Sequence, residues 1–415
     1  MSKIQRFSQF VLSEEKNLHM THAEDAVIDG GVTGTRNVIN YLRAIRDMLG
    51  GNTKAAVNLS VKWDGAPAIF AGIDPSDGKF FIAKKGVFNK NPKVYKTAQE
   101  IDDDSSIKGD LNSKFKVALS EFAKLGIEGV IQGDFLYTTE DLSTDTIDGE
   151  SYITFHPNTI VYAIPKKSEL AKKISRSKIG VVWHTVYRGS ELEKMSASFG
   201  EKITPNLKEI KSVWHVDAVF EDKSGSVTMT AKETAAVNKK LTAAGQIFRT
   251  IKKDILNEMG NNDELNQRIN VFINQKVRDG QRIGNPRSFV KGLVKYIQDY
   301  YGKEADKKKT ERGKKTQTDK MSKALTMFSD KNTKEIEKVF ELYNLLVDTK
   351  LMVLDKLNKV DSLKTFLKTD KGYEVTNPEG FVAMDHLGKN SLKLVDRLAF
   401  SKANFDPQYI KGWQK

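Results

Sequence analysis

The sequence contains no cysteine among its 415 residues. Disulfide bonds and thiolate-bound metal ions are therefore excluded, and the composition fits a reducing compartment. The sequence also has no apolar run long enough to span a bilayer, and it lacks a charged-then-apolar signal segment at its start. We therefore expect a cytoplasmic protein without a membrane partner, and the composition leaves the oligomeric state open.

Several common functional motifs are missing as well. The sequence shows no internal repeat, no Walker-type phosphate loop, no dinucleotide-binding glycine pattern and no nucleophile elbow. Of its six histidines, His19 and His22 have a spacing that could bind a metal ion on one helix face. Only two ligands are visible there, so packing or capping roles are favoured for all six histidines.

Acidic residues are in deficit. The chain has 67 Lys and Arg residues against 54 Asp and Glu residues, which gives a formal net charge of +13. A basic surface of this size favours a polyanionic partner, with nucleic acid as the first candidate. A lysine-rich surface without a specific ligand is the alternative. The length and a hydrophobic fraction of 39% allow two or three globular domains.

The spacing of apolar residues divides the chain into four segments. Residues 1–52 are predicted to be helical, because apolar side chains recur at helical spacing between Val38 and Leu49. Residues 53–228 are rich in strands and contain one predicted helix, Leu111–Leu125. Residues 229–370 carry helical spacing, and residues 371–415 return to short strands. The strands predicted in the second segment are Val57–Val61, Ala68–Gly72, Lys79–Ala83, Gly129–Tyr137, Tyr152–Phe155, Thr159–Ile164, Gly180–Tyr187 and Val213–Phe220.

This order of segments predicts an α+β fold. Residues 53–228 and 371–415 would form one domain with a mixed, largely antiparallel sheet, and 229–370 would be an all-helical insertion between its two parts. The last helix of the insertion is predicted at Lys334–Leu367. Within the insertion, Gly302–Lys320 is rich in lysine, and we expect a flexible basic loop or the solvated end of a helix. Too few residues follow the last strand for a separate small barrel.

The most informative motif is Lys62-Trp63-Asp64-Gly65, directly after the predicted strand Val57–Val61. A lysine between a strand and an Asp-Gly turn is presented on a rigid edge, where its amine can meet a ligand. In this order, it and the motifs that follow resemble the nucleotidyl-transfer motifs of the covalent nucleotidyltransferase superfamily, which includes ATP-dependent DNA and RNA ligases and mRNA-capping enzymes. The later motifs are Phe80-Phe81-Ile82-Ala83-Lys84-Lys85-Gly86, Gly133-Asp134-Phe135-Leu136-Tyr137, Glu379-Gly380-Phe381-Val382 and Ser391-Leu392-Lys393-Leu394-Val395.

The resemblance implies a reaction in which Lys62 attacks ATP and carries AMP as a covalent phosphoramidate. The amine must be neutral at the working pH, and further lysines and a bound metal ion would favour that form. Asp64 and Gly65 would belong to the same nucleotide-binding motif, and the glycine would let the backbone approach the nucleotide closely. A surface lysine before a tight turn is the alternative interpretation.

The resemblance also implies nucleotide-binding residues in the middle of the strand-rich segment. Lys84 or Lys85 would stand near the ribose or the phosphates, where the family commonly has arginine. Asp134, in place of the family's glutamate, would accept from a ribose hydroxyl or help to hold the metal; a strand-end aspartate in a turn is the alternative. Tyr162 would stack on the purine, although a tyrosine on a core strand is more often simply packed.

Two positions near the C-terminus complete the implied site. Glu379 would coordinate the Mg²⁺ that neutralises the phosphates, with Asp134 as the second metal-binding candidate. Lys393 would contact the α-phosphate and is the second catalytic candidate beside Lys62. The family has Lys-x-Lys at this point, whereas Ser391 or Val395 takes the place of the other lysine here.

Two functions remain open. The first is an ATP-dependent polynucleotide ligase, with RNA more favoured than DNA because no downstream barrel follows the last strand. The second is a non-catalytic structural or nucleic-acid-binding protein that keeps a degraded nucleotidyltransferase fold. The chain, including Phe155-His156-Pro157-Asn158, also resembles uncharacterised proteins of tailed phages, which implies the host cytoplasm or a virion. The residues do not separate ATP from GTP.

The basic residues of the insertion are the predicted contact with a nucleic-acid backbone. A solubilising loop that touches no ligand is the alternative. The predicted contact residues are Lys307, Lys308, Lys309, Lys314 and Lys315, together with Lys252, Lys253, Arg278, Arg282 and Arg287.

Overall fold

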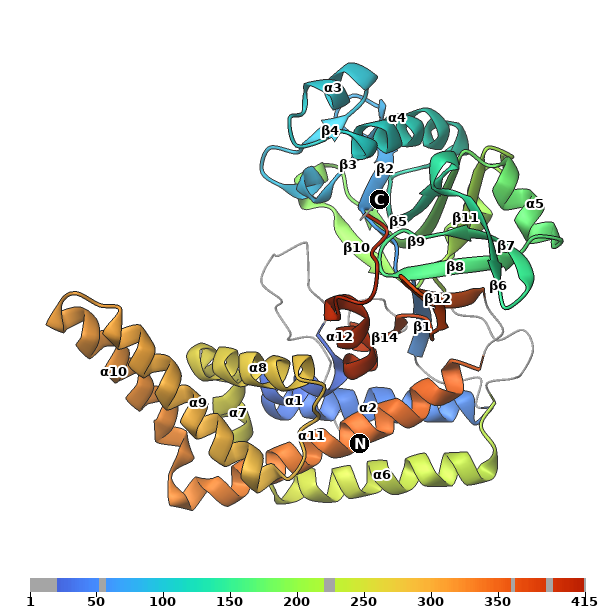
Figure 1. Ribbon diagram of the computed structural model, residues 1–415. Coiled ribbons are helices and arrows are strands. Elements are labelled where there is room, and N and C mark those ends of the chain that lie inside the picture. The colour runs from blue at the N-terminus through green and yellow to red at the C-terminus, as the bar shows by residue number, and fades with distance from the viewer. Residues whose placement is uncertain (1–20, 52–56, 220–227, 360–362, 386–390, 414–415) are drawn as a thin grey trace, which may run out of the picture.

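The computed structural model describes residues 21–51, 57–219, 228–359, 363–385 and 391–413 and shows a mixed α+β protein. Within these residues the strands form three sheets, and all strand pairs are antiparallel except the parallel pair of β11 and β9. Helices gather on one side of the molecule and strands on the other (Figure 1). Residues 1–20, the first part of the expected N-terminal helical segment, lie outside the described residues.

The first sheet joins two distant parts of the sequence. It has the order β1 (Val57–Lys62), β14 (Gly380–Asp385) and β15 (Ser391–Leu394). Residues directly opposite each other across two strands share a face of the sheet. Because Lys62 is opposite Gly380 and Lys393 is opposite Val382, both lysines lie on the same face.

The opposite face of this sheet is apolar and packs on helices. It presents Leu59, Phe381, Ala383, Leu392 and Leu394, which are buried in the core of the helical side of the molecule. The alternation of apolar and polar residues along these strands thus separates a packed face from a face that carries the two lysines.

The second sheet is the largest of the described residues. Its order is β10-β9-β5-β2-β3-β4, and β11 is added along β9. Helix α4 covers one face through Phe115 and Phe122, which pack against Phe135 and Trp183. The strands are β2 (Ala68–Ile73), β3 (Phe80–Ala83), β4 (Val94–Tyr95), β5 (Val130–Thr138), β9 (Ile179–Arg188), β10 (Ser196–Phe199) and β11 (Val213–Asp217).

The third sheet is a three-stranded meander extended by two strands from late in the sequence. Its order is β13 (Gly372–Val375), β12 (Lys364–Thr369), β8 (Ile160–Pro165), β7 (Glu150–Phe155) and β6 (Ser143–Ile147). Phe155, Ile160, Tyr162 and Ile164 of this sheet pack against Tyr137 and other residues of the second sheet. The connecting helices of the strand-rich part are α3 (Ala98–Asp103), α4 (Asp110–Phe122), α5 (Glu169–Arg176) and α12 (Arg397–Phe405).

The helical part combines the N-terminal helices with those of the insertion. Its helices bury one continuous apolar core, so the two segments are packed as one unit. The apolar spacing of α2 places Val38, Leu42 and Ile45 in this core as expected. The helices are α1 (Ala26–Asp29), α2 (Gly31–Leu49), α6 (Ala231–Thr250), α7 (Lys253–Asn261), α8 (Asp263–Arg278), α9 (Pro286–Asp306), α10 (Glu311–Leu325) and α11 (Asp330–Leu357).

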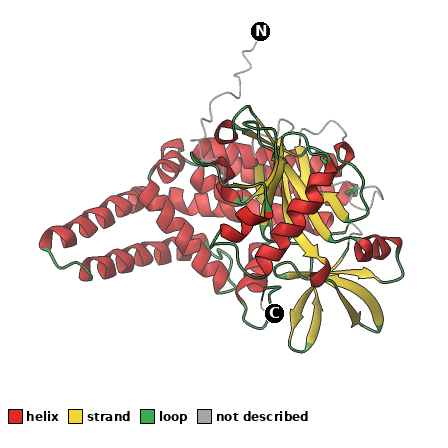
Figure 2. Cartoon of the chain, turned by 90° about the horizontal axis from the view of Figure 1, so that it is seen from above, coloured by secondary structure: helices red, strands yellow, loops and turns green. Residues whose placement is uncertain are grey.

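Helices α9 and α10 form a hairpin that projects away from the rest of the molecule (Figures 1 and 2). The expected basic loop Gly302–Lys320 is not a long loop: it comprises the end of α9, a short turn and the start of α10. Thr310 caps α10, since its side-chain oxygen accepts from the backbone N–H of Gly313 at 3.1 Å. Of the two predictions for this segment, a flexible loop or the solvated end of a helix, the second agrees better with the structure.

One predicted boundary is wrong. The helix expected at Lys334–Leu367 ends at Leu357, and Lys364–Thr369 is strand β12. Phe366 of β12 is buried opposite Val161 of β8, so the neighbouring strand decides the local structure. The strand-rich part thus resumes before residue 371, inside the segment predicted to be wholly helical.

Candidate functional site

Lys62, Glu379 and Lys393 meet at the end of the first sheet. The ammonium group of Lys62 donates a hydrogen bond to Oε2 of Glu379, the residue before β14. Gly380 follows with a φ of +149°, and a Cβ there would come within 2.4 Å of the carbonyl oxygen of Leu394. Only glycine lets β14 begin this close to β15, so the Glu-Gly pair fixes the carboxylate beside the lysine.

Burial and neighbouring charges shift the pKa values of the two residues beside Lys62, which are Glu379 and Lys393. The Glu379 side chain is 7% exposed, and burial raises its pKa to about 7, although Lys62 opposes the shift. Burial lowers the pKa of the Lys393 amine, and the charge of Lys62 lowers it further. A carboxyl group that titrates near neutral pH thus lies between two cationic side chains.

Asp64 holds the loop after β1 to a second loop, instead of pointing at open space. Its buried carboxylate accepts from the Asn158 side chain at 2.6 Å and from the backbone N–H groups of Thr159 and Ile160, each at 2.7 Å. Gly65 is required for the same packing, because a Cβ there would lie 2.7 Å from Asp134 Cβ. These contacts make both residues positioning residues for the turn after Lys62.

Tyr162 lies beneath this turn, and the predicted stacking on a purine does not fit its surroundings. The residue is 3% exposed. Its ring centroid lies 5.1 Å from that of Trp63 and 5.2 Å from that of Phe155. Its hydroxyl oxygen accepts from the backbone N–H of Asp64 at 2.8 Å, and burial raises its pKa well above the usual value. Because both ring faces are covered, a base-stacking residue must be sought elsewhere.

Asp134 belongs to the same group of charges. Its carboxylate, like those of Asp64 and Glu379, contributes to raising the pKa of Tyr162, so the three acids surround one hydroxyl. Asp134 keeps 26% of its side chain exposed and lies 3.7 Å from Nε2 of His184 on β9. This acid therefore remains accessible to a ligand, unlike Asp64.

The other two predicted nucleotide-binding residues are Lys84 and Lys85, which follow strand β3. The β2–β3 and β2–β5 registers place the end of β3 at the same edge of the second sheet as Asp134. However, Lys84 donates to Ser106 at 2.7 Å and lies 3.6 Å from Asp104, while Lys85 is exposed. The contacts of Lys84 therefore do not support it as a direct partner of Lys62.

A cavity of about 380 Å³ adjoins Glu379, and we call it the site cavity. This volume lies within the range of roughly 300–1,000 Å³ that small-molecule sites occupy. Asp64 and Glu379 line it from the strand-rich part, Asp355 lines it from α11, and Asn404 lines it from α12. Arg282 is the basic residue of the lining. The other predicted site residues are not part of this wall, namely Lys62, Lys84, Lys85, Asp134, Tyr162 and Lys393.

The carboxylates present suit a hard cation that is shared with phosphate oxygens. Among the described residues, no group of three or more His, Asp or Glu side chains is arranged to hold a metal ion by itself. Mg²⁺ commonly takes one or two carboxylates and completes its shell with substrate oxygens and water. Glu379 and Asp134 could fill this role, whereas the oxygens of Asp64 already accept three N–H donors.

The five lysines predicted to bind nucleic acid lie around the turn of the α9–α10 hairpin. All five are exposed. Lys307 pairs with Glu304 at 2.6 Å and Lys314 pairs with Glu311 at 2.8 Å. Within the described chain, no carboxylate forms an ion pair with Lys308, Lys309 or Lys315. The structure thus presents these cations to solvent, and nothing in it shows what they bind.

The sequence did not predict that Thr21 and His22 would lie next to Lys393. The backbone N–H of Lys393 donates to Thr21 at 3.0 Å, which brings the following residue, His22, alongside β15. Burial, helped by Arg397 and Lys350, lowers the pKa of His22 to about 2, so its imidazole is neutral. The chain before α1 carries no strand pattern, and only the fold places it here.

The comparisons with known proteins give a family but no function. The model of a family of unknown function, DUF6267, matches residues 17–409, and the chain belongs to that family. No curated protein and no solved structure matches the chain. Among the helices of the described residues, none combines the length and apolar character that a membrane span requires.

Proposed function

We propose that this protein is an ATP-dependent polynucleotide ligase, more readily of RNA than of DNA, that works through a lysyl-AMP intermediate on Lys62. One observation carries the proposal: Lys62 and Lys393, more than 300 residues apart, lie on one face of one sheet beside the buried Glu379. The motif resemblance predicted these three residues as a set. The antiparallel sheets around them support the expected nucleotidyltransferase fold.

In the first step, the neutral amine of Lys62 attacks the α-phosphorus of ATP. The bond to the bridging oxygen breaks and pyrophosphate leaves, while the amine loses a proton. Glu379 accepts a hydrogen bond from this amine, and its pKa of about 7 allows its carboxylate to take up that proton. Lys393, on the same face, stabilises the negative charge on the α-phosphate.

In the later steps, AMP moves to a strand end and is then released. A 5′-phosphate oxygen attacks the lysyl-AMP, Lys62 leaves, and a 3′-hydroxyl then displaces AMP to join the strands. When bound, Mg²⁺ would neutralise phosphate charge, with Glu379 and Asp134 as its candidate ligands. Asp64 fixes the turn after Lys62 through buried hydrogen bonds to Thr159 and Ile160. These bonds do not depend on a ligand, so the turn keeps Lys62 in place through all steps.

The test is self-labelling with α-³²P-ATP and Mg²⁺, followed by a denaturing gel and peptide mapping. We expect label on the peptide that contains Lys62, and no label in Lys62→Ala or Lys62→Arg. Substituting α-³²P-GTP under the same conditions tests the choice of nucleotide. Wild-type labelling in Lys62→Ala would show that the nucleophile has been assigned wrongly.

A non-catalytic nucleic-acid-binding protein is the second candidate, and specific contacts favour it. Tyr162 is covered on both ring faces, and Lys84 is directed to Ser106 and Asp104 instead of the site. A protein of this kind would bind a strand with salt-dependent affinity and show no covalent label with either nucleotide. The labelling experiment therefore separates the two candidates.

A further inference from the structure

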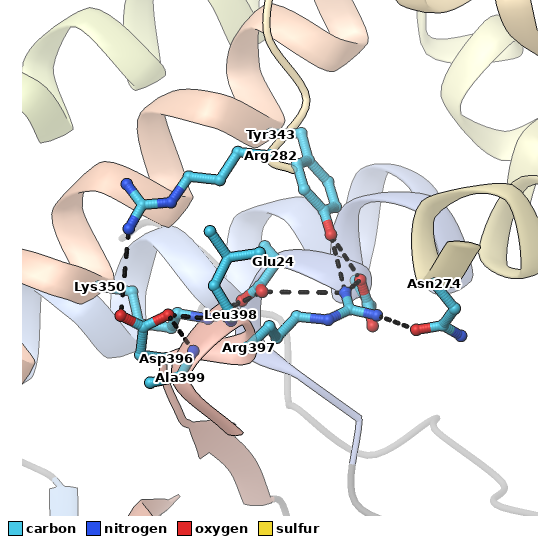
Figure 3. A network of polar contacts seen from close by, with 10 residues as sticks. Glu24, Asn274, Arg282, Tyr343, Lys350, Asp396, Arg397, Leu398 and Ala399 are labelled. Atoms are coloured by element: carbon cyan, nitrogen blue, oxygen red, sulfur yellow. Dashed lines mark hydrogen bonds and ion pairs between the residues drawn. The ribbon is translucent and has the colours of Figure 1, made fainter. Parts of the chain in front are cut away.

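A second cavity, of about 220 Å³, lies beside the site cavity where α8, α11 and α12 converge, and we call it the junction cavity. The two cavities share Arg282, Leu351 and Asp396 in their walls. Figure 3 shows the polar residues around it: the Arg282 side chain extends towards Asp396, and Glu24, Lys350 and Arg397 form the wall beyond. A group in the junction cavity would therefore lie next to one in the site cavity.

Each acidic residue of the junction cavity is already satisfied. The carboxylate of Glu24 accepts from Lys350 at 2.7 Å with both oxygens. Asp348 pairs with Lys240 at 2.7 Å. Asp396 caps α12, because one of its oxygens accepts from the backbone N–H groups of Leu398 at 3.0 Å and Ala399 at 3.4 Å. The acids of the wall thus leave little uncompensated negative charge.

Among the described basic residues of the wall, Lys276 has no carboxylate partner and Arg282 has only one long ion pair. Arg397 donates to Asp25 at 2.7 Å, to Tyr343 at 2.9 Å and to Asn274 at 2.6 Å, so both of its terminal nitrogens already have acceptors. Arg282 reaches a carboxylate only at 4.0 Å, from Asp396, and keeps 49% of its side chain exposed. Within the described residues, no carboxylate pairs with Lys276, whose ammonium lies 5.5 Å from the ring centroid of Phe272. The cavity therefore has a net positive wall.

The volume limits what this positive wall can hold. At about 220 Å³ the junction cavity is smaller than typical small-molecule sites of roughly 300–1,000 Å³, but it has room for one phosphoryl group with water. A guanidinium offers a planar fork that matches two phosphate oxygens, and an ammonium adds a point charge. Arg282 and Lys276 supply this pair.

We infer that the junction cavity binds a phosphoryl group of the substrate through Arg282 and Lys276. The inference rests on the proposed function and places the nucleotide of that reaction in the adjoining site cavity, beside Glu379. Two sources share this chemistry: the 5′-phosphate at the end of a polynucleotide, and the terminal phosphates of ATP. In either case the helical part takes part in recognising the substrate, although the resemblance placed every implied nucleotide contact in the strand-rich part.

The experiment compares the affinities for two pairs of ligands. The members of the RNA pair differ by the 5′-phosphate, and ATP differs from AMP by its β- and γ-phosphates. Fluorescence anisotropy measures binding of an RNA oligonucleotide with a 5′-phosphate and of the same RNA with a 5′-hydroxyl. Calorimetry measures binding of ATP and of AMP. A hydrogen bond to a charged group contributes about 1.5–3 kcal/mol, so Lys276→Gln should reduce one of the two wild-type affinity ratios by about tenfold or more. Arg282→Gln should reduce the same ratio.

The matched control is Lys172→Gln on α5, which removes one exposed lysine in the strand-rich part. It should leave both ratios at their wild-type values. A lowered ratio for RNA assigns the cavity to the strand end, and a lowered ratio for ATP assigns it to the nucleotide. If wild type shows no preference in either pair, or if Lys276→Gln keeps both preferences, the inference is wrong. Self-labelling at Lys62 is scored separately, so loss of the proposed function does not remove this test.

Discussion

Glu379 is a buried acid whose proton affinity links the site to pH. In the unfolded chain its pKa is 4.5, and in the folded protein burial raises it to about 7. Between these values the folded state holds a proton that the unfolded state has lost, so this residue's contribution to stability falls as pH rises.

We therefore expect the free energy of unfolding of wild type, relative to Glu379→Gln, to decrease by about 1–3 kcal/mol between pH 4.5 and pH 7. Urea unfolding of both proteins across this range measures the difference. A difference that is independent of pH would contradict the raised pKa.

Asp64 and Lys62 are neighbours in one motif, but the structure predicts different effects for their substitution. Asp64→Ala leaves two buried backbone N–H donors and the half-buried Asn158 amide without their acceptor and should destabilise the protein by about 2–4 kcal/mol. Lys62→Ala removes a side chain that is 25% exposed and should abolish labelling with little loss of stability. Chemical denaturation and labelling of both variants separate the roles. Wild-type stability in Asp64→Ala would instead favour direct contact of this carboxylate with the nucleotide.

For individual residues, the sequence predicts the position in the site only where a motif lies on or next to a strand. Lys62, Glu379 and Lys393 could be predicted as a set, and the sheet register brings them together. The partners of Asp64 lie 94 to 96 residues away and carry no motif. Phe155 reaches Tyr162 as its cross-strand neighbour, but Trp63 does so only because the loop after β1 folds over the third sheet, which local sequence does not specify.

At the scale of elements, the α9–α10 hairpin presents lysines that differ in their surroundings. Lys308, Lys309 and Lys315 lack a carboxylate partner among the described residues, whereas Lys307 and Lys314 are paired within one helical turn. On binding a single strand, each phosphate contact contributes about 0.7 to the slope of log affinity against log salt.

We therefore expect the triple variant with Gln at positions 308, 309 and 315 to lower that slope by about two units. The double variant with Gln at 307 and 314 should lower it by less. Anisotropy of labelled RNA over a salt series provides the measurement. Identical slopes in wild type and both variants would show that the hairpin tip does not contact the strand.

Strand β12 shows why an element can be missed. Lys364–Thr369 lies next to a run of helical spacing and has only two buried apolar side chains, Phe366 and Leu367. It pairs on one side with β13, which follows it after a short turn, and on the other with β8, about 200 residues earlier in the sequence. Long helices such as α2 could be predicted because their own periodicity determines the buried face.

At the scale of the molecule, a buried ion pair ties the chain before α1 to the longest helix, α11. Glu24 and Lys350 are each 1% exposed and lie 326 residues apart. Removing one partner of such a pair leaves an uncompensated buried charge and costs about 3–5 kcal/mol. Lys350→Met should therefore be strongly destabilising. Adding Glu24→Gln should recover part of the loss, and chemical denaturation of the two variants checks this; a double variant no better than the single would show that the charge itself is not the cost.

The first sheet also has a mechanical consequence. Its apolar face is embedded in the helical core, so β1, β14 and β15 translate and rotate with the helices, including the projecting hairpin. A load applied at the hairpin tip would therefore reach Lys62 and Lys393 together and leave the spacing between them unchanged. Asp134 belongs to the second sheet, so its position relative to the two lysines depends on the packing of Gly65 against it and on the hydrogen bond from Val61 to Ala218.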